Sequence, residues 1–226
     1  FQEERERPVL VVLDASPTLY FGTRKRLKSV AAGQMAAAVG WAAVRRGDRI
    51  GGFMFAPGQH REIRPAGGRR GAMRLIQGLV DWLQPDRQTS GGPEPLSTAL
   101  ERVRHTVRPG SLVIIISDFF GLDEHCHRHL SRLRLHSDVI GCQVLDAAEH
   151  SLPAGRYPIT DGDQATVLDT GHGASRNRYE SMGQRHLEEP RRLFQKHDCG
   201  WLALNTDDDP VDVLGRELRV LVGRPV

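Results

Sequence analysis

The chain has 226 residues, a length that suits one α/β domain able to bury a core without a disulfide or metal to hold it together. Its hydrophobic content of 39% and charged content of 26% are ordinary for a globular protein, and a formal charge of +3 gives no support for a nucleic-acid partner. No apolar run approaches the ~20 residues that span a bilayer, so we expect no membrane contact from this segment. The three cysteines show no metal-binding spacing and suit a reducing compartment, so we expect a cytoplasmic location.

The chain begins at Phe1 and runs through a charged stretch directly into an apolar one. We interpret residues 1–226 as a single domain and expect it to be a fragment that lacks an N-terminal segment. Within it, residues 146–173 are rich in turn-forming residues and are expected to form a hairpin excursion.

The first half of the chain opens with a continuous apolar run, PVLVVL, which is typical of a parallel strand buried on both faces. Apolar residues then recur at three- and four-residue spacing, as in an amphipathic helix, and this alternation repeats. We predict a strand over 8–13, a helix over 23–46, a strand over 50–55 with a short edge at 62–64, and helices over 71–83 and 96–107.

The second half repeats the pattern from a second buried strand, SLVIII, at residues 111–116. We predict a helix over 124–135, a strand over 138–145, a helix over 175–197, a strand over 201–204 and a last helix over 211–222. Strands that alternate with helices of this length imply a mostly parallel central sheet with helices on both faces, a three-layer α/β fold.

Oxygen-bearing side chains follow the two most hydrophobic strands. Asp14, Ser16 and Thr18 stand at alternate positions in the loop after the first strand, and Asp118 follows the strand over 111–116. Ligands of such sheets bind at the carboxyl ends of the strands, and hard divalent cations prefer oxygen ligands. We therefore predict a site for a hard divalent cation such as magnesium here, and interpret the neighbouring Ser117 as a hydroxyl that only satisfies backbone groups.

This pattern resembles the D-x-S-x-S motif of the metal-ion-dependent adhesion site in von Willebrand factor A domains. Its context resembles the bacterial domain-of-unknown-function family 58. The stretches that carry the second resemblance are EERERPVLVVLD, SPTLYFG, GDRIG, ISDF, and VLD followed by Glu149. The resemblance implies a Rossmann-like fold and a magnesium or manganese site. It also implies a protein partner that binds the metal through an Asp or Glu, and a role beside a MoxR-type AAA ATPase in protein assembly or chaperoning.

Two positions depart from the motif. Thr18 stands where the family usually has serine, which keeps the hydroxyl. Pro93 stands where a loop threonine is expected, and proline offers no side-chain oxygen. Either Glu94, Ser90 or Thr89 takes its place, or the metal site is degenerate.

A different class of function uses the same strand ends. In a phosphatase of the haloacid dehalogenase type, Asp14 would be the nucleophile, with Ser117 and the pair Asp207 and Asp208 following in chain order. Ser16 stands where that mechanism needs a second acid, so the group that protonates the leaving group is missing. We therefore predict a binding module without catalytic residues, with the phosphatase as the alternative.

Overall fold

Six strands form the central sheet of the computed structural model, which describes residues 6–84, 92–160 and 165–222. Five are parallel and one edge strand, β3, is antiparallel, in the order β3-β2-β1-β4-β5-β8. Their bounds are β1 Pro8–Asp14, β2 Arg49–Ala56, β3 Gln59–Gly67, β4 Leu112–Ser117, β5 Asp138–Leu145 and β8 Gly200–Asn205. The predicted mostly parallel sheet is confirmed.

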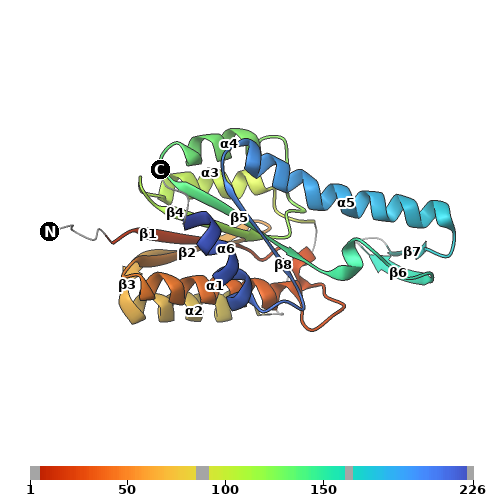
Figure 1. The fold of residues 1–226 in the computed structure, drawn as a ribbon, viewed down its shortest axis with the longest axis horizontal. Helices are drawn as coiled ribbons and strands as arrows, with labels where there is room; N and C mark the ends of the chain where they lie inside the picture. Colours follow the sequence, from red (N-terminus) through yellow and green to blue (C-terminus); the bar gives the residue numbers. More distant parts are fainter. Residues whose placement is uncertain (1–5, 85–91, 161–164, 223–226) are drawn as a thin grey trace.

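Helices cover both faces of this sheet, which gives the predicted three layers (Figure 1). The helices are α1 Lys28–Arg45, α2 Gly68–Trp82, α3 Leu96–Thr106, α4 Cys126–Arg134, α5 Gly173–Lys196 and α6 Pro210–Val222. Helices α1, α2 and α6 share one core cluster with Val9, Val11 and Leu13 of β1. Helices α3, α4 and the end of α5 share the other with Leu10 and Val12. The alternation explains why β1 reads as an unbroken apolar run, since both of its faces are buried.

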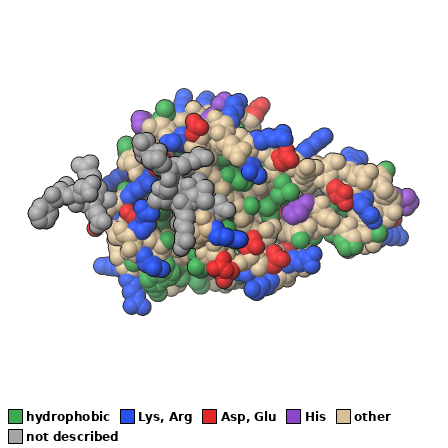
Figure 2. All heavy atoms as spheres, viewed as in Figure 1, with side chains coloured by type: hydrophobic (Ala, Val, Ile, Leu, Met, Phe, Trp, Pro, Cys, Tyr) green, Lys and Arg blue, Asp and Glu red, His purple; other side chains and the backbone are tan. Residues whose placement is uncertain are grey.

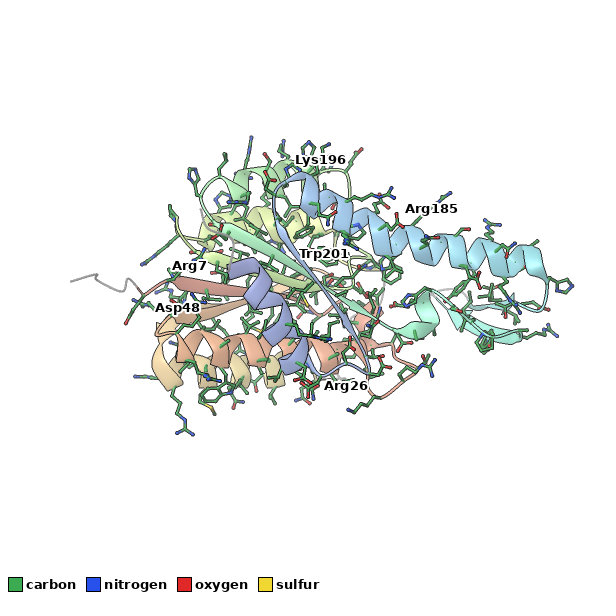
Figure 3. The ribbon with its side chains drawn as sticks, viewed as in Figure 1. Arg7, Arg26, Asp48, Arg185, Lys196 and Trp201 are labelled. Carbon is green, nitrogen blue, oxygen red and sulfur yellow. The ribbon has the colours of Figure 1, made fainter. Side chains whose placement is uncertain are left out.

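An arm extends from the body of the domain. It consists of the amino-terminal part of α5 and a two-stranded hairpin, β6 Arg156–Thr160 and β7 Ala165–Asp169, which lies inside the region 146–173 (Figure 1). The arm leaves from the carboxyl ends of the parallel strands. Arg7 and Asp48 mark the opposite end of the sheet, where the backbone amide of Arg7 donates to Asp48 Oδ1 at 3.0 Å (Figure 3).

Two predicted elements differ most from the structure. The first helix begins at Lys28 instead of residue 23, because Thr23 is held by Asp146, 123 residues away, through its backbone amide at 2.9 Å. The edge strand runs from Gln59 to Gly67 instead of 62–64, because it pairs with β2 from one end to the other, with one irregularity in register, although most of its side chains are exposed.

The surface of the domain is charged but mixed in sign. On the face shown in Figure 2, Lys and Arg side chains are spread over the body and the arm, with Asp and Glu among them. Among the described residues, no helix combines the length and the apolar composition that crossing a bilayer requires.

All three cysteine thiols are free and buried, and burial raises the pKa of Cys126 and Cys142 to about 12 and that of Cys199 to about 11. The thiolate is the reactive form of cysteine, so these side chains should be inert in the folded state. We expect a thiol reagent such as Ellman's reagent to label none of them within minutes in native buffer at pH 8, and all three in denaturant. Rapid labelling of one thiol in native buffer would mean that its strand or helix opens readily.

Candidate functional site

The candidate site lies at the carboxyl ends of β1 and β4, which are neighbours in the sheet. Asp14 ends β1 and is 1% exposed, and Asp118 follows β4 and is fully buried. Three polar groups contact Asp14 or its neighbour Ser16. The amide of Ser16 donates to Asp14 Oδ1 at 2.8 Å, Ser117 Oγ donates to Asp14 Oδ2 at 2.6 Å, and the amide of Glu94 donates to Ser16 Oγ at 3.3 Å.

The carboxylate of Asp14 is electrostatically uncompensated. Burial, together with the charge of Asp118, raises its pKa to about 7, although hydrogen bonds from Ser117 and Ser16 oppose the shift. Among the described residues Asp14 forms no ion pair. Two buried carboxylates whose charges repel each other are a place where a cation would be stabilised.

The second carboxylate, Asp118, is compensated by a lysine. Lys28 Nζ donates to Asp118 Oδ2 at 2.8 Å and to Glu149 Oε1 at 2.5 Å. Burial alone would lower the pKa of Lys28, but the two carboxylates outweigh it, and the pKa lies above its ordinary value. Lys28 is therefore a buried ammonium ion at the first residue of α1.

The other predicted ligands fall in different places. Thr18 lies in a short 3-10 helix, η1 Pro17–Tyr20, which begins where the amide of Leu19 donates to Ser16 O at 3.0 Å. Its Oγ1 is buried and has no hydrogen-bond partner among the described residues. An unpartnered buried hydroxyl is costly, and a bound ion or water would satisfy it.

Of the candidates to replace the missing threonine, Ser90 and Thr89 lie outside the described residues. Glu94 is described: its Oε2 accepts from the amide of Gly58 at 3.0 Å, and its Oε1 lies 3.5 Å from Arg102 Nη1. Its carboxylate oxygens are thus engaged elsewhere, and Glu94 contributes its backbone amide to Ser16.

Sequence reasoning missed two residues of this site. Ser117 does more than satisfy the backbone: besides accepting from the amide of Phe119 at 2.8 Å, it donates to Asp14 and so ties β4 to β1. Lys28 was not singled out, although it is one of only three lysines in the chain and begins a helix.

A second anchored carboxylate, Asp146, joins three segments beside this site. Its Oδ2 accepts from the amide of Thr23 at 2.9 Å and from Thr206 Oγ1 at 2.7 Å, and its Oδ1 from the amide of Ala148 at 3.0 Å. These bonds outweigh burial and hold its pKa below the ordinary value. Asp146 thus fixes the loop after β1 to the ends of β5 and β8.

Replacing Asp146 should lower the stability of the fold, because the amides of Thr23 and Ala148 and the hydroxyl of Thr206 would lose their acceptor. We expect Asp146→Ala to lower the free energy of unfolding by about 2–3 kcal/mol, measured by urea denaturation at pH 7. Asp138→Ala, which removes an exposed carboxylate at the other end of β5, is the matched control and should cost under about 1 kcal/mol. Equal costs would show that Asp146 is not an anchor.

A model for the family described as "Protein of unknown function DUF58" matches residues 1–189. The chain belongs to this family. Uncharacterized proteins Rv1480 of Mycobacterium tuberculosis (strain H37Rv) and Mb1516 of Mycobacterium bovis are each 26% identical to it over 211 residues, which cover 91% of this chain. The chain spans 64% of the length of these curated relatives.

Solved structures confirm the von Willebrand factor A-like, Rossmann-like fold. BatB from Bacteroides thetaiotaomicron superposes with a TM-score of 0.58 at 12% identity, covering 96% of this chain and all of that one. The SpRpn10 VWA domain superposes with a TM-score of 0.50 at 6% identity, covering 93% and 95%. The pilus adhesin SpaC from Lactobacillus rhamnosus GG gives 0.54 at 11%, covering 98% of this chain and 31% of that one. At these identities the likeness concerns the fold.

The residues at the strand ends suit a hard cation. They offer the carboxylate of Asp14, the hydroxyl of Ser16 and the Thr18 hydroxyl, which has no partner in the described part of the chain. Asp118 follows the neighbouring strand β4. The described residues contain no cluster of three or more His, Cys, Asp or Glu side chains placed to hold a metal. An ion here would therefore depend on hydroxyl and water oxygens, as magnesium commonly does.

Proposed function

We propose that this chain is a protein-binding module whose docking face is the carboxyl end of the sheet. Asp14, Ser16 and Thr18 would hold a magnesium or manganese ion there, with Asp118 opposite. The observation that supports this most is the buried Asp14 carboxylate, which feels the negative charge of Asp118 and has no basic partner within the described part of the chain. The ion would supply an electron-poor centre to which an Asp or Glu of a protein partner binds.

The proposed partner is a MoxR-type AAA ATPase, which would provide the energy for protein assembly or chaperoning. This part of the proposal rests on the family resemblance. The docking face would be held together by two long-range hydrogen bonds. The buried bond from Ser117 to Asp14 joins the ends of β4 and β1, and the part-buried bond from the amide of Thr23 to Asp146 joins the loop after β1 to the end of β5. Binding of the ATPase to the full-length protein is expected to require the metal, so both EDTA and Asp14→Ala should abolish it. Binding that survives both would contradict a metal-dependent contact.

The phosphatase alternative receives less support. Asp208 Oδ2 accepts from the amide of Asn205 at 2.8 Å, and Asp209 caps α6 by accepting from the amide of Val211 at 2.8 Å. These acids follow β8, which is separated from β4 by β5. Asp208 and Asp209 therefore have structural roles. Ser16 also stands where that mechanism needs a second acid.

Metal binding can be measured on the isolated chain by thermal melting. A ligand that binds only the folded state stabilises it by about 2.7 kcal/mol at a hundred times its dissociation constant. Millimolar magnesium or manganese should raise the melting temperature of the wild type and leave that of Asp14→Ala unchanged. Asp48→Ala, at the opposite end of the sheet, is the control and should keep the full response. An equal response in wild type and Asp14→Ala would place the ion elsewhere.

A further inference from the structure

The cation that pairs with Asp118 is the ammonium group of Lys28, a side chain of the domain itself. We infer that Lys28 is a resident cation that keeps Asp118 from binding the metal directly, so that Asp14 is the ion's only carboxylate ligand among the described residues. The inference rests on the proposed metal site and adds to it a residue that controls how strongly the ion is held and how electron-poor it stays.

The burial of Lys28 is the first observation. Its side chain is 1% exposed, although lysine is among the residues least often buried. Its Nζ lies 5.1 Å from the ring centre of Phe120 and 5.9 Å from that of Phe21, so the two rings add cation–π contacts to the two carboxylates. A lysine that only covered apolar surface would keep its ammonium group in water.

Both carboxylates around Lys28 are themselves fixed. Glu149 Oε2 accepts from the amide of Asp146 at 2.8 Å, as part of a capping box at the short helix η3 Ala147–Glu149. Asp118 Oδ1 accepts from the amide of Phe120 at 3.2 Å. Neither acid can turn away from the ammonium group without losing a backbone hydrogen bond, so the triad of Lys28, Asp118 and Glu149 is held as a unit.

The ion pair between Lys28 and Asp118 makes the two aspartates at the strand ends electrostatically different. Asp118 has a positive partner at 2.8 Å, whereas the described surroundings of Asp14 supply only hydrogen bonds and a second negative charge. A divalent ion at Asp14 would then receive one full carboxylate charge and neutral oxygens. Affinity for a hard cation follows the number of charged ligands, so the ion would bind weakly to the free domain and favour a carboxylate from a partner.

The test compares two variants that differ only at Lys28. Glu149→Gln keeps the pair between Lys28 and Asp118. Lys28→Met/Glu149→Gln releases Asp118 and leaves one carboxylate of the triad without a cation, whereas Lys28→Met alone would leave two. Manganese binding is measured by titration calorimetry. We expect the double variant to bind manganese at least about tenfold more tightly than Glu149→Gln. Addition of Asp118→Asn should abolish this gain. Equal dissociation constants would overturn the inference.

The outcomes separate this inference from the metal site on which it rests. If wild type and Glu149→Gln bind no manganese but the double variant does, Lys28 controls the site while metal-dependent docking by the wild type fails. If the wild type binds manganese and the double variant binds no tighter, only the role of Lys28 fails. If none of the proteins binds manganese, both fail.

A single variant tests the inference if the double variant does not fold. Asp118→Asn alone should change the manganese dissociation constant of the wild type by less than about threefold, because Asp118 is not a direct ligand. Loss of a direct carboxylate ligand would weaken binding by about tenfold or more. A change of that size would overturn the inference.

Discussion

Lys28→Met should lower the free energy of unfolding by about 3–5 kcal/mol in metal-free buffer at pH 7, the cost of breaking a buried ion pair by removing one partner. Methionine has nearly the same length and fills the space of the side-chain stem. The loss therefore comes from Asp118 and Glu149, two carboxylates that would be left without a cation although their side chains are only 0% and 10% exposed.

Urea denaturation measures this cost, and Lys25→Met is the matched control. Lys25 lies three residues earlier and is exposed, so the same substitution there should change stability by under about 0.5 kcal/mol. Neutralising the whole triad in Lys28→Met/Asp118→Asn/Glu149→Gln should recover most of the loss, because no unpaired charge is then left buried. A cost below about 1 kcal/mol for Lys28→Met would show that the ammonium group is not a structural counter-ion.

The sheet could be predicted because its physics is local. Parallel strands buried on both faces appear as unbroken apolar runs, and the two clearest, at residues 8–13 and 111–116, are indeed the adjacent central strands β1 and β4. Since parallel strands end at the same edge, the proximity of Asp14 and Asp118 followed from the topology. The edge strand β3 was underestimated because exposed charged side chains give no hydrophobic pattern.

The charge balance of the site could not be predicted in the same way. Lys28 begins a helix and looks like an ordinary surface cation, but its burial depends on Asp118 and Glu149, 90 and 121 residues away. Residues 21–27 precede Lys28, and most of them were predicted to be helical. They form a loop instead, because Asp146 binds the backbone amide of Thr23. Such long-range polar contacts leave no periodic signal, and an ion pair can be recognised only once the fold brings its members together.

The other aspartate at the strand ends should give the opposite result when its charge is removed. We expect Asp14→Asn to raise the free energy of unfolding by about 2 kcal/mol in metal-free buffer at pH 8. The pKa of Asp14 is raised from 3.8 to about 7, chiefly by burial and then by Asp118, so the folded state resists its ionisation. Between pH 3.8 and about pH 7 the folded state binds more protons than the unfolded one, so stability falls as pH rises. The penalty is half developed near the folded-state pKa and nearly complete by about pH 8.

Asparagine removes the buried charge and keeps an oxygen for the amide of Ser16, so the gain should be large at pH 8 and small at pH 4, where Asp14 is protonated in the folded state. Manganese should then reverse the ranking at pH 8, since it stabilises only the protein that keeps the carboxylate. If Asp14→Asn is less stable than wild type at pH 8 without metal, Asp14 is an anchor of the loop and no cation is needed there. Hydrolysis of a generic phosphate ester by the wild type, abolished in the same variant, would favour the phosphatase instead. A metal-dependent docking site of this kind requires a carboxylate such as Asp14, whose ionised form lowers the stability of the metal-free domain and is stabilised when a cation binds.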